Sequence, residues 1–79
     1  MKTIVHDWGT ETIVGEHDRV VRIYASSKKV TVDLSQVRDT EWSAYKAAVN
    51  KYGASTKITL KPEADVKIIA EWFERWLSA

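Results

Sequence analysis

Residues 61–77, KPEADVKIIAEWFERWL, carry the strongest pattern in this chain and predict a helix of about four turns. Pro62 suits the first helical position, because the N–H that proline lacks is unpaired there in any helix. One apolar stripe follows the spacing of a buried helix face and consists of Val66, Ile69, Phe73 and Leu77. A second stripe, about 100° round the helix, consists of Ile68, Trp72 and Trp76. The first stripe is enough to close a small fold, so the second needs a separate explanation.

Five segments with the composition and alternation of β-strands precede this helix. They are Thr3–Trp8, Thr12–Val14, Arg19–Tyr24, Lys29–Leu34 and Thr56–Leu60. The clearest alternation lies in the fourth segment, where Val30, Val32 and Leu34 predict an inward face. Short polar turns separate the first four segments, which favours an antiparallel meander.

Another helix is predicted between the fourth and fifth strand segments. Asp39 or Thr40 is a suitable N-cap, and Gly53 suits the left-handed residue that ends many helices. Its inward stripe would contain Trp42, Tyr45, Val49 and Tyr52. Such a helix is long enough for a right-handed crossover, which would allow Thr56–Leu60 to pair parallel to Lys29–Leu34.

The order of these elements, ββββαβα, predicts one α+β domain over residues 1–79. We expect a two-layer sandwich, in which an antiparallel meander is followed by α-β-α and both helices lie on one face of the sheet. A chain of 79 residues buries only about 60–65% of its unfolded surface, so its four tryptophans matter greatly to the core.

The composition also narrows the cellular setting. The chain has no cysteine, which excludes a disulfide framework or a thiolate metal site and fits a reducing compartment. The first residues turn polar too early for a signal peptide, and no segment approaches the roughly 18 apolar residues of a membrane span. We therefore expect a soluble cytoplasmic protein without a membrane partner.

Catalytic and metal sites find little support in the sequence. His6 and the turn Glu16-His17-Asp18 could meet if the first two strands pair, which would supply part of a divalent metal site. Their spacing matches no zinc signature, so solvated histidines are the favoured interpretation. No serine lies in a nucleophile elbow, and three glycines form no phosphate-binding loop. We expect no enzyme activity, no catalytic residue, no metal and no small-molecule cofactor.

The charges are unevenly distributed although the formal net charge is only +1. Residues 1–18 carry a net charge of −3 and residues 19–38 a net charge of +4. A basic hairpin with an aromatic side chain can lie on a phosphate backbone and stack a base. This alternative, a weak nucleic-acid-binding module, would use Arg19, Arg22, Tyr24, Lys28 and Lys29. Because acidic side chains lie close by in the sequence, a solvated sheet face is the favoured interpretation.

The tryptophans carry the most information about function. Trp42 is predicted in the core beneath the sheet, and Trp8 at a hairpin end is predicted to cap the core edge. The C-terminal helix has more apolar surface than so small a core needs, and tryptophan is enriched at interface centres. We therefore expect a non-enzymatic protein–protein interaction module that binds a protein partner, or itself as a dimer, through Ile68, Trp72 and Trp76. Complete burial of these side chains against the first helix stays open as the alternative.

Parts of the chain resemble known groups of proteins. The Asp18–Ile23 strand, the helix ending Lys51-Tyr52-Gly53, and the strand and helix after it resemble small accessory domains attached to conjugation relaxases. The resemblance carries no sequence motif, so it implies no functional residue. In size and tryptophan content the chain is also similar to small phage or mobile-element accessory and inhibitor proteins, which work by binding a host protein.

Overall fold

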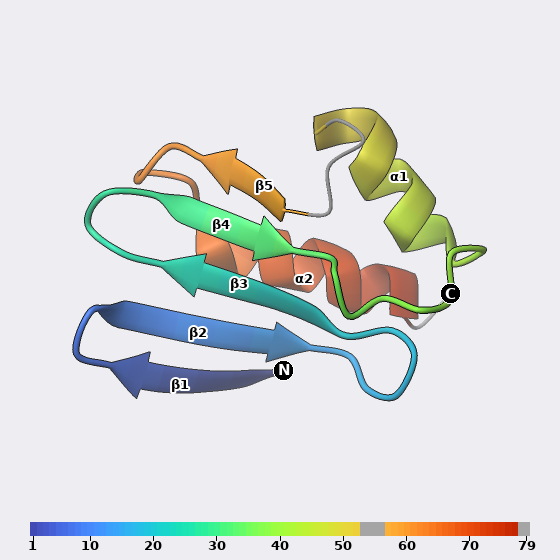
Figure 1. The fold of residues 1–79 in the computed structure, drawn as a ribbon, viewed down its shortest axis with the longest axis horizontal. Coiled ribbons are helices and arrows are strands. Elements are labelled where there is room, and N and C mark those ends of the chain that lie inside the picture. Colours follow the sequence, from blue (N-terminus) through green and yellow to red (C-terminus); the bar gives the residue numbers. More distant parts are fainter. Residues whose placement is uncertain (53–56, 78–79) are drawn as a thin grey trace.

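The computed structural model describes residues 1–52 and 57–77, which form one sheet and two helices (Figure 1). In chain order, the elements are β1 (Lys2–His6), β2 (Gly9–Val14), β3 (Val21–Ala25), β4 (Val30–Asp33), α1 (Ser43–Tyr52), β5 (Lys57–Leu60) and α2 (Val66–Leu77). The strands follow one another across the sheet in the order β1-β2-β3-β4-β5, and every neighbouring pair is antiparallel. The predicted α+β class and the order ββββαβα are confirmed. The predicted helix end at Gly53 lies outside the described residues.

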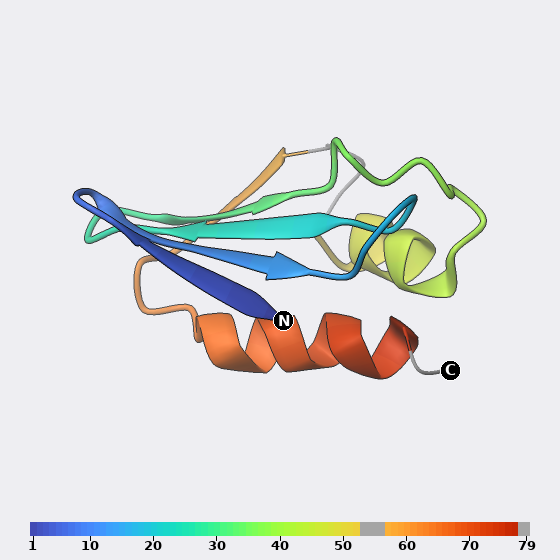
Figure 2. The same ribbon diagram turned by 90° about the horizontal axis from the view of Figure 1, so that it is seen from below.

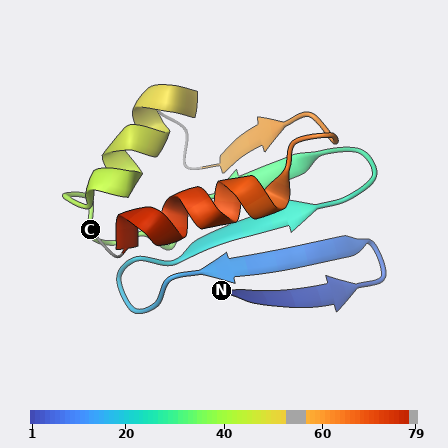
Figure 3. The same ribbon diagram turned by 180° about the vertical axis from the view of Figure 1, so that it is seen from behind.

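One face of the sheet is covered by α2, which runs lengthwise beneath β2 and β3 (Figure 2). α1 packs against α2 at one end of the sheet (Figure 3). Alternate residues of the strands therefore enter the core, and the largest fully buried strand side chains are Val14, Val21, Ile23, Val30 and Val32. The inward face predicted for the fourth strand is confirmed, since Leu34 is also buried.

Helix α2 begins four residues later than Pro62, the predicted first residue. The carboxylate of Asp65 accepts hydrogen bonds from the backbone N–H groups of Lys67 at 2.9 Å and Ile68 at 3.2 Å. These are N–H groups that the helix itself leaves unpaired, so Asp65 is the N-cap. Pro62 lies instead in the preceding turn, which the N–H of Ala64 closes on the carbonyl of Lys61 at 3.0 Å. Neither helix in the described part of the chain is long and apolar enough to cross a membrane.

Both helices approach the core through small side chains that their apolar stripes did not single out. On α2, Ala70 is fully buried beside Ile69 and Phe73. On α1, Ala44 and Ala48 are fully buried, whereas the predicted inward residues Tyr45, Val49 and Tyr52 are only partly buried and flank them. Alanine has no side chain beyond Cβ, so it lets a helix backbone come close to its neighbour, and the larger side chains fill the sides of the contact.

Trp42 precedes α1 and lies in the core, as predicted. Its side chain is 4% exposed, and its ring centre lies 6.2 Å from that of Phe73. The backbone N–H of Trp42 donates to the carbonyl of Asp39 at 3.1 Å, which closes the turn before the helix. The helix then starts at Ser43, later than a cap at Asp39 or Thr40 implies. The early turn and the helix are separate pieces of structure joined at Trp42.

The pairing of β5 differs from the parallel arrangement that a crossover would allow. β5 pairs antiparallel with β4, and its first residue, Lys57, lies opposite Asp33 at the end of β4. The chain therefore leaves the sheet after β4, forms α1 at that end, and returns at the same end. A parallel pair would require the helix to run back along the full length of the sheet. α1 does not do so, because it packs at the sheet's end (Figure 1).

Candidate functional site

In the described part of the chain, no helix lies over the face of the sheet opposite α2 (Figure 2). Cross-strand register decides which side chains meet on that face. Glu11 lies opposite Ile4 on one side and Tyr24 on the other, so these side chains share that face. Arg22 lies opposite Ile13 on the same face. We name this surface the open face; from β1 to β5 its strand residues are Lys2, Ile4, His6, Glu11, Ile13, Arg22, Tyr24, Thr31, Asp33, Lys57 and Thr59.

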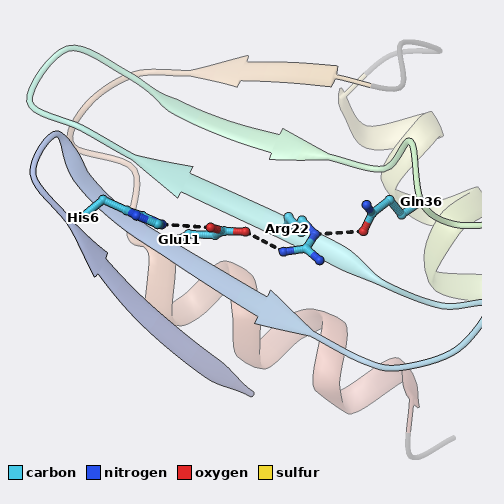
Figure 4. Close-up of polar contacts among 4 residues, drawn as sticks. All are labelled: His6, Glu11, Arg22 and Gln36. Atoms are coloured by element: carbon cyan, nitrogen blue, oxygen red, sulfur yellow. Dashed lines mark hydrogen bonds and ion pairs between the residues drawn. The ribbon is translucent and has the colours of Figure 1, made fainter.

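A continuous chain of polar contacts crosses the open face from β1 to the segment after β4 (Figure 4). His6 Nε2 donates to Glu11 Oε1 at 2.9 Å, and Arg22 Nη1 donates to Glu11 Oε2 at 2.5 Å. Arg22 Nε also donates to Gln36 Oε1 at 2.8 Å. One carboxylate thus accepts from two side chains on two different neighbouring strands.

This arrangement favours the ionised form of Glu11. The hydrogen bond from His6, followed by that from Arg22, holds the pKa of Glu11 below its ordinary value of 4.5. On the same face, burial raises the pKa of the Tyr24 hydroxyl, and the nearby charge of Glu11 adds to that rise. At neutral pH the centre of the open face therefore contains a carboxylate whose charge is matched by Arg22 and a neutral tyrosine.

Aromatic side chains gather beside the histidine end of this polar chain. The rings of His6 and Trp8 stack with centres 4.8 Å apart and planes 11° from parallel. The ring centre of Trp8 also lies 6.0 Å from that of Tyr24. Trp8 nevertheless remains 50% exposed, whereas Trp42 is 4% exposed. The prediction that Trp8 caps the core edge is wrong, because the tight turn after β1 carries its ring onto the open face.

Gly9 allows that turn to approach β3 closely. Its φ is +152°, and a Cβ at this position would lie 1.9 Å from the carbonyl oxygen of Ala25. Any other residue would therefore force the β1–β2 turn away from β3. The glycine thus keeps Trp8 within reach of Tyr24.

The residues of the predicted partner-binding helix surface are not equally exposed. Ile68 is 63% exposed, whereas Trp72 and Trp76 are partly buried and pack against the core. The rings of Trp72 and Trp76 lie 6.0 Å apart, and Lys51 Nζ of α1 lies 5.7 Å from the centre of Trp72. The core and α1 thus cover much of Trp72 and Trp76, whereas Ile68 remains at the surface.

The five residues of the predicted nucleic-acid surface fall in three different places. Arg19 lies away from the open face, where it pairs with Asp39 at 2.9 Å and its guanidinium lies 5.9 Å from the Trp42 ring. Arg22 and Tyr24 lie on the open face, with Arg22 bonded to Glu11. Lys28 and Lys29 are exposed in the β3–β4 turn. The ion pair between Glu11 and Arg22 joins the acidic first hairpin to the basic second one across the β2–β3 pair.

The two histidines lie at opposite ends of the first hairpin, so the approach between them that a metal site would need does not occur. β1 pairs with β2 so that His6 lies opposite Gly9, while His17 follows the far end of β2. His17 lines an open groove of about 590 Å³ together with Glu16, Asp18 and Arg19. Within residues 1–52 and 57–77, no three His, Asp or Glu side chains are grouped closely enough to hold a metal ion.

The contribution of Trp8, His6 and Glu11 to one surface was not identified from the sequence. Arg22 and Tyr24 were placed on one strand face by their alternation, but their neighbours on β1 and β2 depend on register. The sequence did contain a signal for Trp8: Asp7-Trp8-Gly9 occupies a hairpin turn, where a large aromatic side chain has no core to enter.

Comparison of the chain with protein families, with curated proteins and with solved structures gives no match. Its own surface therefore carries the functional inference.

Proposed function

We propose that this chain is a non-enzymatic module that binds another protein through the open face of its sheet. The observation that carries the proposal is the half-exposed Trp8 beside Tyr24 and Arg22 on the face of the sheet opposite α2. Tryptophan, tyrosine and arginine are the residue types that contribute most often to the binding energy of protein interfaces. Here all three lie on one face of the sheet, where Trp8 is exposed and Arg22 and Tyr24 are partly exposed.

The contacts around Trp8 support a surface that is ordered before a partner binds. Its ring stacks on His6, His6 bonds to Glu11, and Glu11 bonds to Arg22. Each contact limits the rotation of the next side chain. A surface ordered in this way loses little conformational entropy on binding, so more of the contact energy appears as affinity.

The charges of the open face favour a protein over a nucleic acid as partner. Arg22 already donates to Glu11 and Gln36, so a phosphate would compete with a carboxylate for it. Few free cations mean few phosphate contacts and weak, salt-sensitive binding. Nucleic-acid binding remains the second candidate, because Trp8, Tyr24 and Lys29 line a hollow of about 90 Å³ where a base could stack.

The helix surface of Ile68, Trp72 and Trp76 is the other candidate contact for a protein partner. Trp72 and Trp76 already pack on the core and on α1, so a partner would gain less by covering them than by covering Trp8. For this reason we place the main contact on the open face. Ile68 then provides a matched control, because its side chain is also large, apolar and exposed.

The test compares three forms of the full chain as immobilised bait in extract of the source cell. We expect a protein retained in a fixed ratio by the wild type and by Ile68→Ala, and lost by Trp8→Ala. Nuclease treatment of the extract should leave this retention unchanged. If retention of the protein is lost in Ile68→Ala and kept in Trp8→Ala, the partner contacts α2 and not the open face. Binding of a labelled single-stranded oligonucleotide at about 50 mM salt, lost in Trp8→Ala, would favour the second candidate.

A further inference from the structure

Strand β1 is an outer edge of the sheet, and no helix or strand of residues 1–52 and 57–77 lies along that edge (Figures 1 and 3). Only two residues join β1 to β2, with His6 opposite Gly9. The pair that closes such a hairpin exchanges hydrogen bonds, and bonded pairs then alternate along the ladder. His6, Ile4 and Lys2 therefore bond to β2. The backbone N–H and C=O groups of Thr3 and Val5 point outward.

The centre of the exposed edge lacks the proline and the charges that usually prevent strands from pairing, and Lys2 stands only at the start of the strand. Proteins protect edges with proline, bulges, central charges or very short strands. The centre of β1 is Thr3-Ile4-Val5, an uncharged run of β-branched residues, and the Val5 side chain is 80% exposed. The opposite edge, β5, is also uncharged at its centre and also starts at a lysine, but it has four residues against the five of β1. The longer strand, with its exposed Val5, is the edge better suited to pairing.

We propose that β1 pairs antiparallel with β1 of a second copy of this chain, about a twofold axis at Ile4. In that register Thr3 lies opposite Val5 of the second copy, so the outward backbone groups of one copy meet those of the other. All five residues of β1 take part, and the two sheets join into one. Registers centred on Thr3 or Val5 leave part of the strand unpaired or run into the turn.

The side chains and charges of β1 suit this occupant. On the helix side, Val5 of the second copy would lie beside Thr3, which lines a groove of about 370 Å³ with Val66 and Ala70 of α2. Lys2 and His6 begin and end the strand, and both lie on the open face. The register about Ile4 sets Lys2 of one copy opposite His6 of the other, whereas a parallel copy would set two Lys2 side chains opposite each other. α2 lies over β2 and β3, which keeps the helices of the two copies apart.

The consequence is a continuous open face with one Trp8 site on each side of the twofold axis. Two sites on one rigid particle would bind a repeated or dimeric partner more tightly than either site alone. The pairing itself is independent of what occupies the open face. Its test therefore needs no partner.

The experiment measures the mass of the full chain, tagged only at its C-terminus, by sedimentation equilibrium from about 1 μM to about 1 mM. Val5→Pro removes an outward N–H that the monomer does not use, and an edge strand tolerates proline there. We expect a dimer for the wild type and at least about tenfold weaker association for Val5→Pro. Val5→Thr keeps the N–H and the β-branch, so it should still dimerise, as should Trp8→Ala.

Amide hydrogen exchange identifies the surface directly. The backbone amides of residues 3 and 5 should exchange more slowly as the protein concentration rises. The same dependence is expected in Val5→Thr. A wild type that stays monomeric up to about 1 mM would overturn the proposal. So would a dimer that Val5→Pro leaves unchanged, since that dimer must use another surface, such as Ile68 on α2. If a variant loses partner binding but still dimerises, the result concerns the proposed function of the open face and leaves the pairing of β1 unaffected.

Discussion

The two faces of the sheet are built from alternate residues of the same strands, yet their characters are opposite. On the covered face, Val21 and Ile23 of β3 are fully buried. On the open face, the intervening Arg22 and Tyr24 make polar and aromatic contacts and stay partly exposed. Apolar burial on one face supplies most of the stability that a short chain can have. The other face is therefore free to carry large side chains for recognition.

The largest expected effect is on the covered face. Phe73→Ala removes a fully buried ring that contacts Trp42, and should lower the free energy of unfolding by about 3–5 kcal/mol. Urea unfolding followed by far-UV circular dichroism measures the change. Ile68→Ala on the same helix is the control, because truncating this exposed side chain should lower the free energy of unfolding by no more than about 0.5 kcal/mol.

A chain of this size can lose its fold altogether when Phe73 is truncated. Ile23→Val then tests the same face with a milder change, expected to cost about 0.5–1.5 kcal/mol. Equal losses for Phe73→Ala and Ile68→Ala would contradict the burial of Phe73 between α2 and the covered face of the sheet.

An intermediate effect is expected at Glu11, where the open face contributes to stability through charge. Because the folded protein holds the pKa of Glu11 below 4.5, the ionised carboxylate stabilises the fold above the unfolded pKa. That contribution is lost as the pH falls through the lower, folded pKa. Glu11→Gln should therefore reduce stability at neutral pH, and the difference from the wild type should shrink in acid.

Urea midpoints of both proteins at a series of pH values measure this difference. Arg22→Gln should reduce the same pH dependence, because it removes one of the two donors to Glu11. A gap between Glu11→Gln and the wild type that is constant from neutral to acid pH would show that the carboxylate acts by packing and not by charge.

The smallest effect on stability is expected for Trp8→Ala, although this change should have the largest effect on binding. Half of the ring is already in solvent, and its contacts are with His6 and Tyr24 at the surface. We expect a loss within about 0.5 kcal/mol, together with a clear change in tryptophan fluorescence. A loss of several kcal/mol would instead make Trp8 a core residue and remove the basis of the open-face proposal.

The features that the sequence predicted well depend on near neighbours in the chain. Alternation placed Val30 and Val32 in the core, and helical spacing placed Ile69 and Phe73 there. The start of α2 was predicted wrongly, because Pro62 and Asp65 are both favourable near a helix start. The helix begins at the residue whose side-chain oxygen reaches the unpaired N–H groups of the first turn, and that residue is Asp65. The role of Ala70 was missed, because alanine carries little signal in an apolar stripe.

What the sequence alone determined is the set of elements, their order and most of the core, since each follows from periodicity within one segment. The tertiary structure decided which residues of different strands meet: His6 with Glu11, Glu11 with Arg22, and Trp8 with Tyr24. It also decided that β5 returns antiparallel and that much of Trp72 and Trp76 is covered while Trp8 is not. The physical reason is that register and helix placement are set by contacts between distant segments, which no local pattern encodes.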